Sequence, residues 1–236
     1  MAFDPSQFQI SDTSQKYMPV VLLLDVSGSM EGDKIDNLYF ATTKMIDTFI
    51  EEGKKEIPYK VAIITFGKEL TCHTRYTDAK DLQNLEKFEA NGMTPLGAAL
   101  KMAKAMIEDK TETKSCWYRP AVVLVSDGKP NDQYLEPMRA FINKGRTAKC
   151  QRISMAIGND VDFDMLKNFA SDESFVFKAE DANDIYNKFK LVTMSITSRT
   201  ASTNPNDFAG ANNTASETPS RRSQVFSSNN IEDDYL

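Results

Sequence analysis

Short runs of residues that are apolar on both faces alternate with amphipathic helical patterns through most of this chain. The runs cover residues 20–24, 61–66, 121–125 and 153–157. Between them, large apolar residues recur every three or four positions, which is the spacing of an amphipathic helix. Strands that are apolar on both faces belong in the middle of a sheet that is covered on both sides. The pattern therefore predicts an α/β fold, a doubly wound and mostly parallel Rossmann-like sheet with helices on both faces.

The remaining segments refine this prediction. Residues 70–76 alternate between apolar and polar side chains, which predicts one antiparallel strand at an edge of the sheet. Pro95 is a favoured first residue of a helix, so we expect a helix to begin there. Asp181 is a plausible cap for a last helix that runs through residues 185–196.

Composition divides the chain into three parts. Residues 1–17 are polar and show no periodicity, so we expect a flexible N-terminal lead-in. Residues 18–198 carry the α/β pattern and form the predicted domain. Residues 199–236 are rich in Ser, Thr and Asn, are acidic overall, and hold few large apolar side chains. Such a segment buries too little apolar surface to offset the entropy of ordering, which predicts a disordered tail.

Charge and targeting signals restrict the setting of the protein. The 28 Lys and Arg residues are outnumbered by 34 Asp and Glu, for a net charge of −6, which argues against a nucleic-acid or membrane-surface partner. The longest apolar run is far shorter than the ~20 residues of a membrane span, and the N-terminus lacks the pattern of a secretory signal. The three cysteines have no paired spacing, which is typical of a reducing compartment. We therefore expect a cytoplasmic location.

Oxygen-bearing side chains follow two of the predicted buried strands. Asp25, Ser27 and Ser29 alternate directly after the first strand, and Asp127 follows the strand at 121–125. Thr94 lies on the loop that enters a helix. The carboxyl ends of parallel strands meet at one rim of a sheet, where ligands bind in folds of this class. Two carboxylates and neutral oxygens suit a hard cation such as Mg²⁺ or Mn²⁺, which would still attract a further carboxylate from another molecule.

These residues carry a family resemblance that spans residues 19–197. The DxSxS sequence from Asp25 to Ser29, Thr94 in GMTPLGAAL and Asp127 in VSDGKPND resemble the metal-ion-dependent adhesion site of von Willebrand factor A domains. The resemblance implies that the five side chains named above bind Mg²⁺ or Mn²⁺ directly or through water. It also implies that a partner protein donates Asp or Glu to the ion.

Within that family, the segments TPLGAAL and SDGKPND are most similar to bacterial cytosolic TerY- and YegL-like proteins. This narrower resemblance implies a stress or tellurium-resistance system that uses phospho-signalling. The partner would then be a Ser/Thr kinase or a metal-dependent protein phosphatase. Thr218, before a proline, and Ser223, after two arginines, are candidate phosphorylation sites in that setting, although such short patterns are common in ordinary tails.

Four residues follow the predicted metal ligands on adjacent loops and are positioned to touch a partner around the ion. They are Met30, Glu31, Asp132 and Gln133. The alternative is that these residues are solvated loop positions without a binding role.

Competing functions are distinguished by what the sequence lacks. No P-loop and no GxSxG nucleophile elbow occur, and the one histidine, His73, falls on the expected edge strand away from the rim. We therefore expect a binding module and not an enzyme. One alternative is a self-assembling structural protein whose acidic end, residues 231–236, supplies a carboxylate to a metal site. A less favoured alternative is a metal-dependent phosphoester hydrolase.

Overall fold

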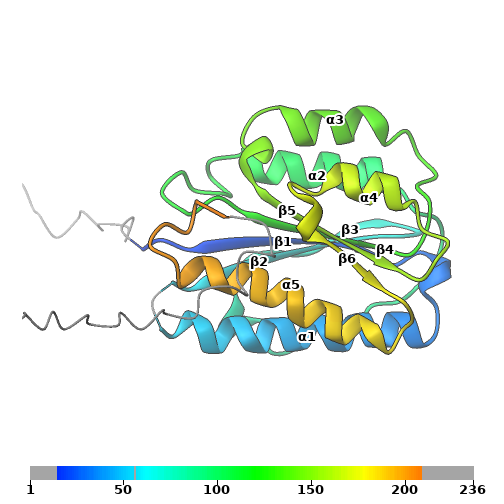
Figure 1. Cartoon of the computed structure of the whole chain (residues 1–236), viewed down its shortest axis with the longest axis horizontal. Helices are drawn as coiled ribbons and strands as arrows, with labels where there is room; N and C mark the ends of the chain where they lie inside the picture. Colours follow the sequence, from blue (N-terminus) through cyan, green and yellow to red (C-terminus); the bar gives the residue numbers. More distant parts are fainter. Residues whose placement is uncertain (1–14, 56, 209–236) are drawn as a thin grey trace, which may run out of the picture.

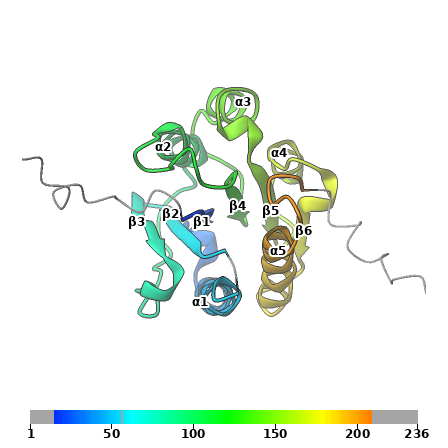
Figure 2. The ribbon, with the colours of Figure 1, turned by 90° about the vertical axis from the view of Figure 1, so that its left-hand side faces the viewer.

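A six-stranded sheet between two layers of helices makes up the folded part of the chain (Figures 1 and 2). The computed structural model describes residues 15–55 and 57–208. The strand order is β3-β2-β1-β4-β5-β6, with all pairs parallel except β2 and β3. The strands are β1 (Met18–Asp25), β2 (Tyr59–Phe66), β3 (Leu70–Asp78), β4 (Ala121–Ser126), β5 (Gln151–Ile157) and β6 (Val176–Ala179). The predicted α/β class and the antiparallel edge strand are confirmed.

The helices divide between the two faces of the sheet, as Figure 2 shows from the end of the molecule. One face is covered by α1 (Asp33–Gly53) and α5 (Asp184–Thr200), which lie side by side. The other is covered by α2 (Leu96–Glu108), α3 (Leu135–Asn143) and α4 (Phe163–Phe169). The strand residues Val20 and Leu22 belong to the α1/α5 core, whereas Val21 and Leu23 belong to the α2–α4 core. The central strands are apolar on both faces because each face packs against helices.

The predicted start of α2 agrees with the structure, whereas α5 begins at Asp184 with Asn183, not Asp181, in the N-cap position. Helix α2 begins at Leu96, directly after Pro95. The Asp181 carboxylate accepts hydrogen bonds from the backbone N–H groups of Asn183 (2.8 Å) and Asp184 (3.1 Å). These bonds satisfy amide groups that would otherwise have no partner at the start of α5.

The folded region extends beyond both predicted boundaries of the domain. Tyr17, predicted to belong to a flexible lead-in, packs its ring 5.4 Å from that of Trp117. At the other end, residues 199–208 are anchored by Arg199, which is 3% exposed and lies 4.8 Å from the Phe208 ring. Residues 1–14 and 209–236, which include Thr218, Ser223 and the acidic end at 231–236, lie outside the described residues.

The helices show no membrane-spanning character. None of those within residues 15–55 and 57–208 is both long enough and apolar enough to cross a bilayer.

Candidate metal centre

The candidate site lies at the carboxyl ends of the two central strands, β1 and β4. After β1 the chain turns through a short 3₁₀ helix, Gly28–Met30, before α1 begins. The Asp25 carboxylate, at 0% exposure, accepts hydrogen bonds from the Ser27 N–H (2.9 Å) and the Ser126 hydroxyl (2.6 Å). Because these donors come from the turn after β1 and from β4, Asp25 is fixed with respect to both central strands.

Ser29 connects the turn after β1 with the end of β4. Its hydroxyl lies 3.1 Å from the Ser27 Oγ and donates a 2.6 Å hydrogen bond to Oδ1 of Asp127. Asp127 is itself 3% exposed. Four of the five predicted ligands, all except Thr94, are thus linked by short contacts.

Thr94 reaches the same rim on the loop before α2. Its N–H donates to Oδ1 of Asn131 (3.0 Å) and its carbonyl accepts from the Asn131 N–H (3.2 Å), which ties this loop to the one after β4. A Cβ atom placed on Gly128 would lie 3.7 Å from both the Ser29 Oγ and the Thr94 Oγ1. The two hydroxyls therefore converge on one point beside the end of β4.

Gly92 sets the course of the Thr94 loop. It has a φ of +79°, and a Cβ on this residue would lie 2.3 Å from the Cα of Lys68. Its carbonyl accepts a 3.0 Å hydrogen bond from the N–H of Gly28, in the turn after β1. A side chain at this position would have to push the Thr94 loop away from the turn between β2 and β3, where Lys68 lies.

Gly92→Ala is therefore expected to lower the free energy of unfolding by at least about 2 kcal/mol more than Gly158→Ala, which adds backbone strain without a steric clash. Gly158→Ala is the matched control, because Gly158 has a φ of +78° and a Cβ added there would meet nothing within 4 Å. Urea unfolding of the two variants measures the difference. Equal losses of stability would contradict the role given to the close approach of Lys68.

Burial and local charge shape the electrostatics of the site. Burial raises the pKa of Asp25; the hydrogen bonds from Ser126 and Ser27 oppose this shift, and the neighbouring charge of Asp127 adds to it. The Nζ of Lys34 lies 2.6 Å from Oδ2 of Asp127 and donates to the Ser29 carbonyl at 3.2 Å. A cationic group therefore already occupies the Asp127 carboxylate.

The donor set fits a hard divalent cation. It consists of two buried carboxylates and three hydroxyls, without sulfur or imidazole, and oxygen donors of this kind suit Mg²⁺, Mn²⁺ or Ca²⁺. Within the described part of the chain, no group of three His, Cys, Asp or Glu side chains comes together as a metal site would require. Any ion held here would therefore need the hydroxyl groups as ligands as well as the two carboxylates. In this structure the positive charge beside Asp127 is the ammonium group of Lys34.

The predicted partner-contacting residues have different surroundings. Glu31 and Gln133 are exposed. Met30 is 0% exposed, because the 3₁₀ turn directs it into the core beneath α1, so the expected partner contact is wrong for this residue. The half-buried Asp132 accepts hydrogen bonds from the N–H groups of Gly97 (2.9 Å) and Ala98 (3.0 Å), so its carboxylate holds the start of α2.

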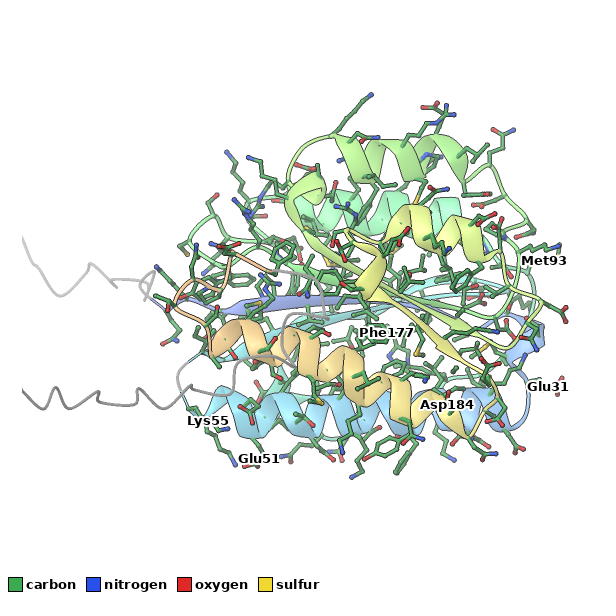
Figure 3. The ribbon with its side chains drawn as sticks, viewed as in Figure 1. Glu31, Glu51, Lys55, Met93, Phe177 and Asp184 are labelled. Atoms are coloured by element: carbon green, nitrogen blue, oxygen red, sulfur yellow. The ribbon has the colours of Figure 1, made fainter. Side chains whose placement is uncertain are left out.

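Several functional candidates carry no clear signal in the sequence. Lys34 and Ser126 contact the acidic ligands, and Asn131 holds the Thr94 loop. Met93 (62% exposed) and Leu135 (58%) are exposed apolar side chains near the rim. Figure 3 shows Met93 and Glu31 at the same end of the molecule, opposite residues 201–208 in Figure 1. An exposed apolar residue on a loop could only be identified once the fold had been placed in space.

Comparison with known proteins places the chain in a family. The family model for the von Willebrand factor type A domain matches residues 20–190. Inter-alpha-trypsin inhibitor heavy chain H2 of Sus scrofa is 24% identical over 215 residues, which cover 81% of this chain and 23% of that protein. The chain thus spans about a quarter of this relative's length.

Solved structures agree on the fold. Proximal thread matrix protein 1 from the mussel byssus superposes with a TM-score of 0.62 at 18% identity, covering 76% of this chain and 48% of that one. A second structure of that protein, described as having a zinc-occupied MIDAS motif, gives a TM-score of 0.60 at 17% identity over 76% and 46% of the two chains. The family match, the sheet order and the helices on both faces agree, and the chain belongs to the von Willebrand factor type A domain family.

Proposed function

We propose that this chain is a protein-binding module in which a divalent ion, Mg²⁺ or Mn²⁺, joins it to an acidic side chain of a partner protein. The observation that carries this proposal is the convergence of oxygen atoms from three separate loops at one end of the sheet. The residues are Asp25, Ser27, Ser29, Thr94 and Asp127. The zinc-occupied MIDAS motif of the mussel protein supports metal binding within the family.

The chain's own residues hold the donors in place before any ligand arrives. Ser126 and the Ser27 N–H orient Asp25, and Asn131 fixes the loop of Thr94. A bound divalent ion would supply a Lewis-acid position at the rim. Because Asp25 and Asp127 contribute only two negative charges, a further carboxylate is attracted to the ion and is repelled when the ion is absent.

The surface beside the donors would supply the remaining contacts with the partner. A groove of about 610 Å³ lies between α2 and α3 and includes Lys101, Tyr134 and the exposed Leu135. The same groove includes Asp132 and Gln133, on the loop that Asn131 ties to Thr94. A partner segment with an apolar residue close to its acidic residue could place the acidic side chain on the ion and the apolar side chain in this groove.

Leu135→Ser is expected to weaken partner binding by about 5- to 10-fold, which is the loss of roughly 1 kcal/mol of apolar contact. Its affinity for Mn²⁺ should be unchanged, because Leu135 supplies none of the five oxygen donors. Leu191→Ser on α5, where the leucine is 45% exposed, is the matched control and should retain full binding. Equal effects of the two variants would exclude the groove from the interface.

Affinity capture from host lysate tests the proposed function. The baits are wild type in Mg²⁺, wild type in EDTA, and Asp25→Asn in Mg²⁺. The expected result is a protein retained by the first bait alone, whose binding is lost when its contacting Asp or Glu is changed to Asn or Gln. The same set of proteins on all three baits would overturn the proposal.

An enzymatic role has less support from the site. His73 lies on β3, where its ring packs edge-on against Phe88 at 5.3 Å, and β3 is separated from β1 by β2. Within the described residues, the charge that acts on Asp25 comes from Asp127, and the ion pair of Asp127 is with Lys34. No dedicated general base is therefore placed beside the carboxylates.

The finer expectations from the sequence stay predictions. The sequence relative named above is an inter-alpha-trypsin inhibitor heavy chain, which does not support a TerY- or YegL-like stress system with a kinase or phosphatase partner. The cytoplasmic location likewise stays a prediction. Self-assembly through residues 231–236 predicts that tagged wild type captures an untagged copy in Mg²⁺ but not in EDTA, so the capture experiment also tests this alternative.

A further inference from the structure

Lys34 is in direct contact with two of the proposed ion-binding residues. It lies in the first turn of α1, and its Nζ is 2.6 Å from Oδ2 of Asp127 and 3.2 Å from the Ser29 carbonyl oxygen. The Asp127 side chain in this ion pair is 0% exposed, whereas that of Lys34 is 33% exposed. Because one partner is fully buried, this pair is screened less by water and salt than a surface pair.

Both oxygens of Asp127 are engaged within the chain. Oδ1 accepts the Ser29 hydroxyl at 2.6 Å, and Oδ2 accepts Lys34. A divalent ion that uses Asp127 would meet the ammonium group at the same carboxylate. Two cations so close together repel each other strongly in a partly buried site.

We propose that Lys34 is a tethered cation that competes with the divalent ion for Asp127 and so sets the ion concentration at which the site fills. This inference rests on the proposed ion site. Lys34 neutralises the buried Asp127 while the ion is absent. When the ion binds, the ammonium moves into the solvent on its flexible four-carbon stem, for which its one-third exposure leaves room.

A purely structural ion pair would behave differently from a competitor. Removal of a structural lysine would loosen Asp127 and leave the ion affinity unchanged or weaker. Removal of a competitor makes ion binding tighter. General loss of positive charge is a third explanation, and Lys129 controls for it because it is exposed, lies two residues after Asp127, and has no ion pair among the described residues.

Isothermal titration calorimetry of the full chain with MnCl₂ and with MgCl₂, at 150 mM KCl, tests the inference. Lys34→Gln is expected to bind either ion about 10-fold more tightly than wild type, whereas Lys34→Arg and Lys129→Gln stay within about 3-fold of it. Unchanged or weaker binding by Lys34→Gln would overturn the inference, as would an equal gain in Lys129→Gln.

Thermal unfolding gives a second readout that does not depend on the calorimetry. In EDTA, Lys34→Gln should melt below wild type, because the buried Asp127 has lost its counter-charge. In saturating Mn²⁺ this deficit should disappear; a deficit that persists unchanged would contradict competition. If no variant binds either ion, this inference and the proposed function fail together. If Lys34→Gln binds ions more tightly but no partner is captured in Mg²⁺, only the protein-binding proposal fails.

Discussion

Asp25→Asn is expected to weaken the binding of Mg²⁺ and Mn²⁺ by at least about 100-fold, because it removes one of only two charged ligands from the site. The substitution preserves shape. The Asn oxygen can still accept from the Ser27 N–H, and its amide can donate to the Ser126 hydroxyl oxygen, in place of the bonds that Asp25 now makes. Calorimetric titration of wild type and variant with MnCl₂ measures the loss. Affinity within a few-fold of wild type would exclude Asp25 as a ligand.

The same variant should make the ion-free protein more stable at neutral pH. Burial raises the pKa of Asp25 above its ordinary value of 3.8, so the folded state favours the protonated carboxyl. The folded wild-type protein therefore loses stability as the pH rises from that ordinary value through the raised pKa. The Asn side chain of the variant carries no charge, so the variant does not lose stability in this way. Urea unfolding in EDTA should show a gap between variant and wild type that widens as the pH rises from about 4.

Asp109→Asn is the control for this pH dependence, because the pKa of Asp109 is shifted in the opposite direction from that of Asp25. Hydrogen bonds from the Thr111 hydroxyl and N–H lower the pKa of the exposed Asp109. Asp109 therefore stabilises the folded state once the pH exceeds the pKa of this residue in the unfolded state. As the pH rises, Asp109→Asn should become less stable than wild type. If the Asp25→Asn advantage narrowed over the same range, the assignment of a buried, destabilising charge would be wrong.

Arg199→Ala is expected to destabilise the protein by about 3 kcal/mol. The guanidinium is buried and donates to the Pro205 carbonyl (2.8 Å), the Gln151 side chain (3.1 Å) and the Arg119 carbonyl (2.7 Å). Truncation would remove the donor from the acceptors on the buried residues Gln151 and Pro205. Residues 201–208 would also lose the hydrogen bond at Pro205 and the contact of Phe208 with Arg199, which hydrogen exchange of their amides would detect.

Arg139→Ala is the matched control for Arg199. The Arg139 side chain is 71% exposed and makes one ion pair, at 3.4 Å to Glu136, so its removal should change the free energy of unfolding by less than about 0.5 kcal/mol. Comparable losses in the two variants, measured by urea unfolding, would contradict the structural role given to Arg199.

Much of the fold could be predicted because the signal is local. Val20 and Val21 face opposite helical layers and both are buried, so a strand apolar on both sides already indicates a central position in a covered sheet. Leu70–Asp78 alternates because its residues are only partly covered at the edge. The five oxygen donors could be proposed for a similar reason, since parallel strands bring their carboxyl ends to one rim.

Other features depend on contacts that no local pattern records. Met30 stands next to a ligand in sequence, yet a single 3₁₀ turn is enough to bury it. Asp132 hydrogen-bonds the start of a helix that lies over 30 residues earlier in the chain. Composition predicts a disordered tail from residue 199, but the buried Arg199 donates to the Pro205 carbonyl and the Asn206 side chain accepts from the Arg119 N–H, which hold this segment against the domain. The pairing of Lys34 with Asp127 likewise joins the first turn of α1 to the end of β4.

A crystal structure of the full chain grown in MnCl₂, with an anomalous difference map, tests the central claim most directly. We predict one manganese peak at the rim between β1 and β4, among oxygens of Asp25, Ser27, Ser29, Thr94 and Asp127 or waters bound to them. We also predict that the Lys34 ammonium has left Oδ2 of Asp127. A crystal in saturating Mn²⁺ that shows no manganese peak at this rim would contradict the ion site. If the 2.6 Å contact between Lys34 and Asp127 were also intact, the proposed competition for Asp127 would be contradicted as well.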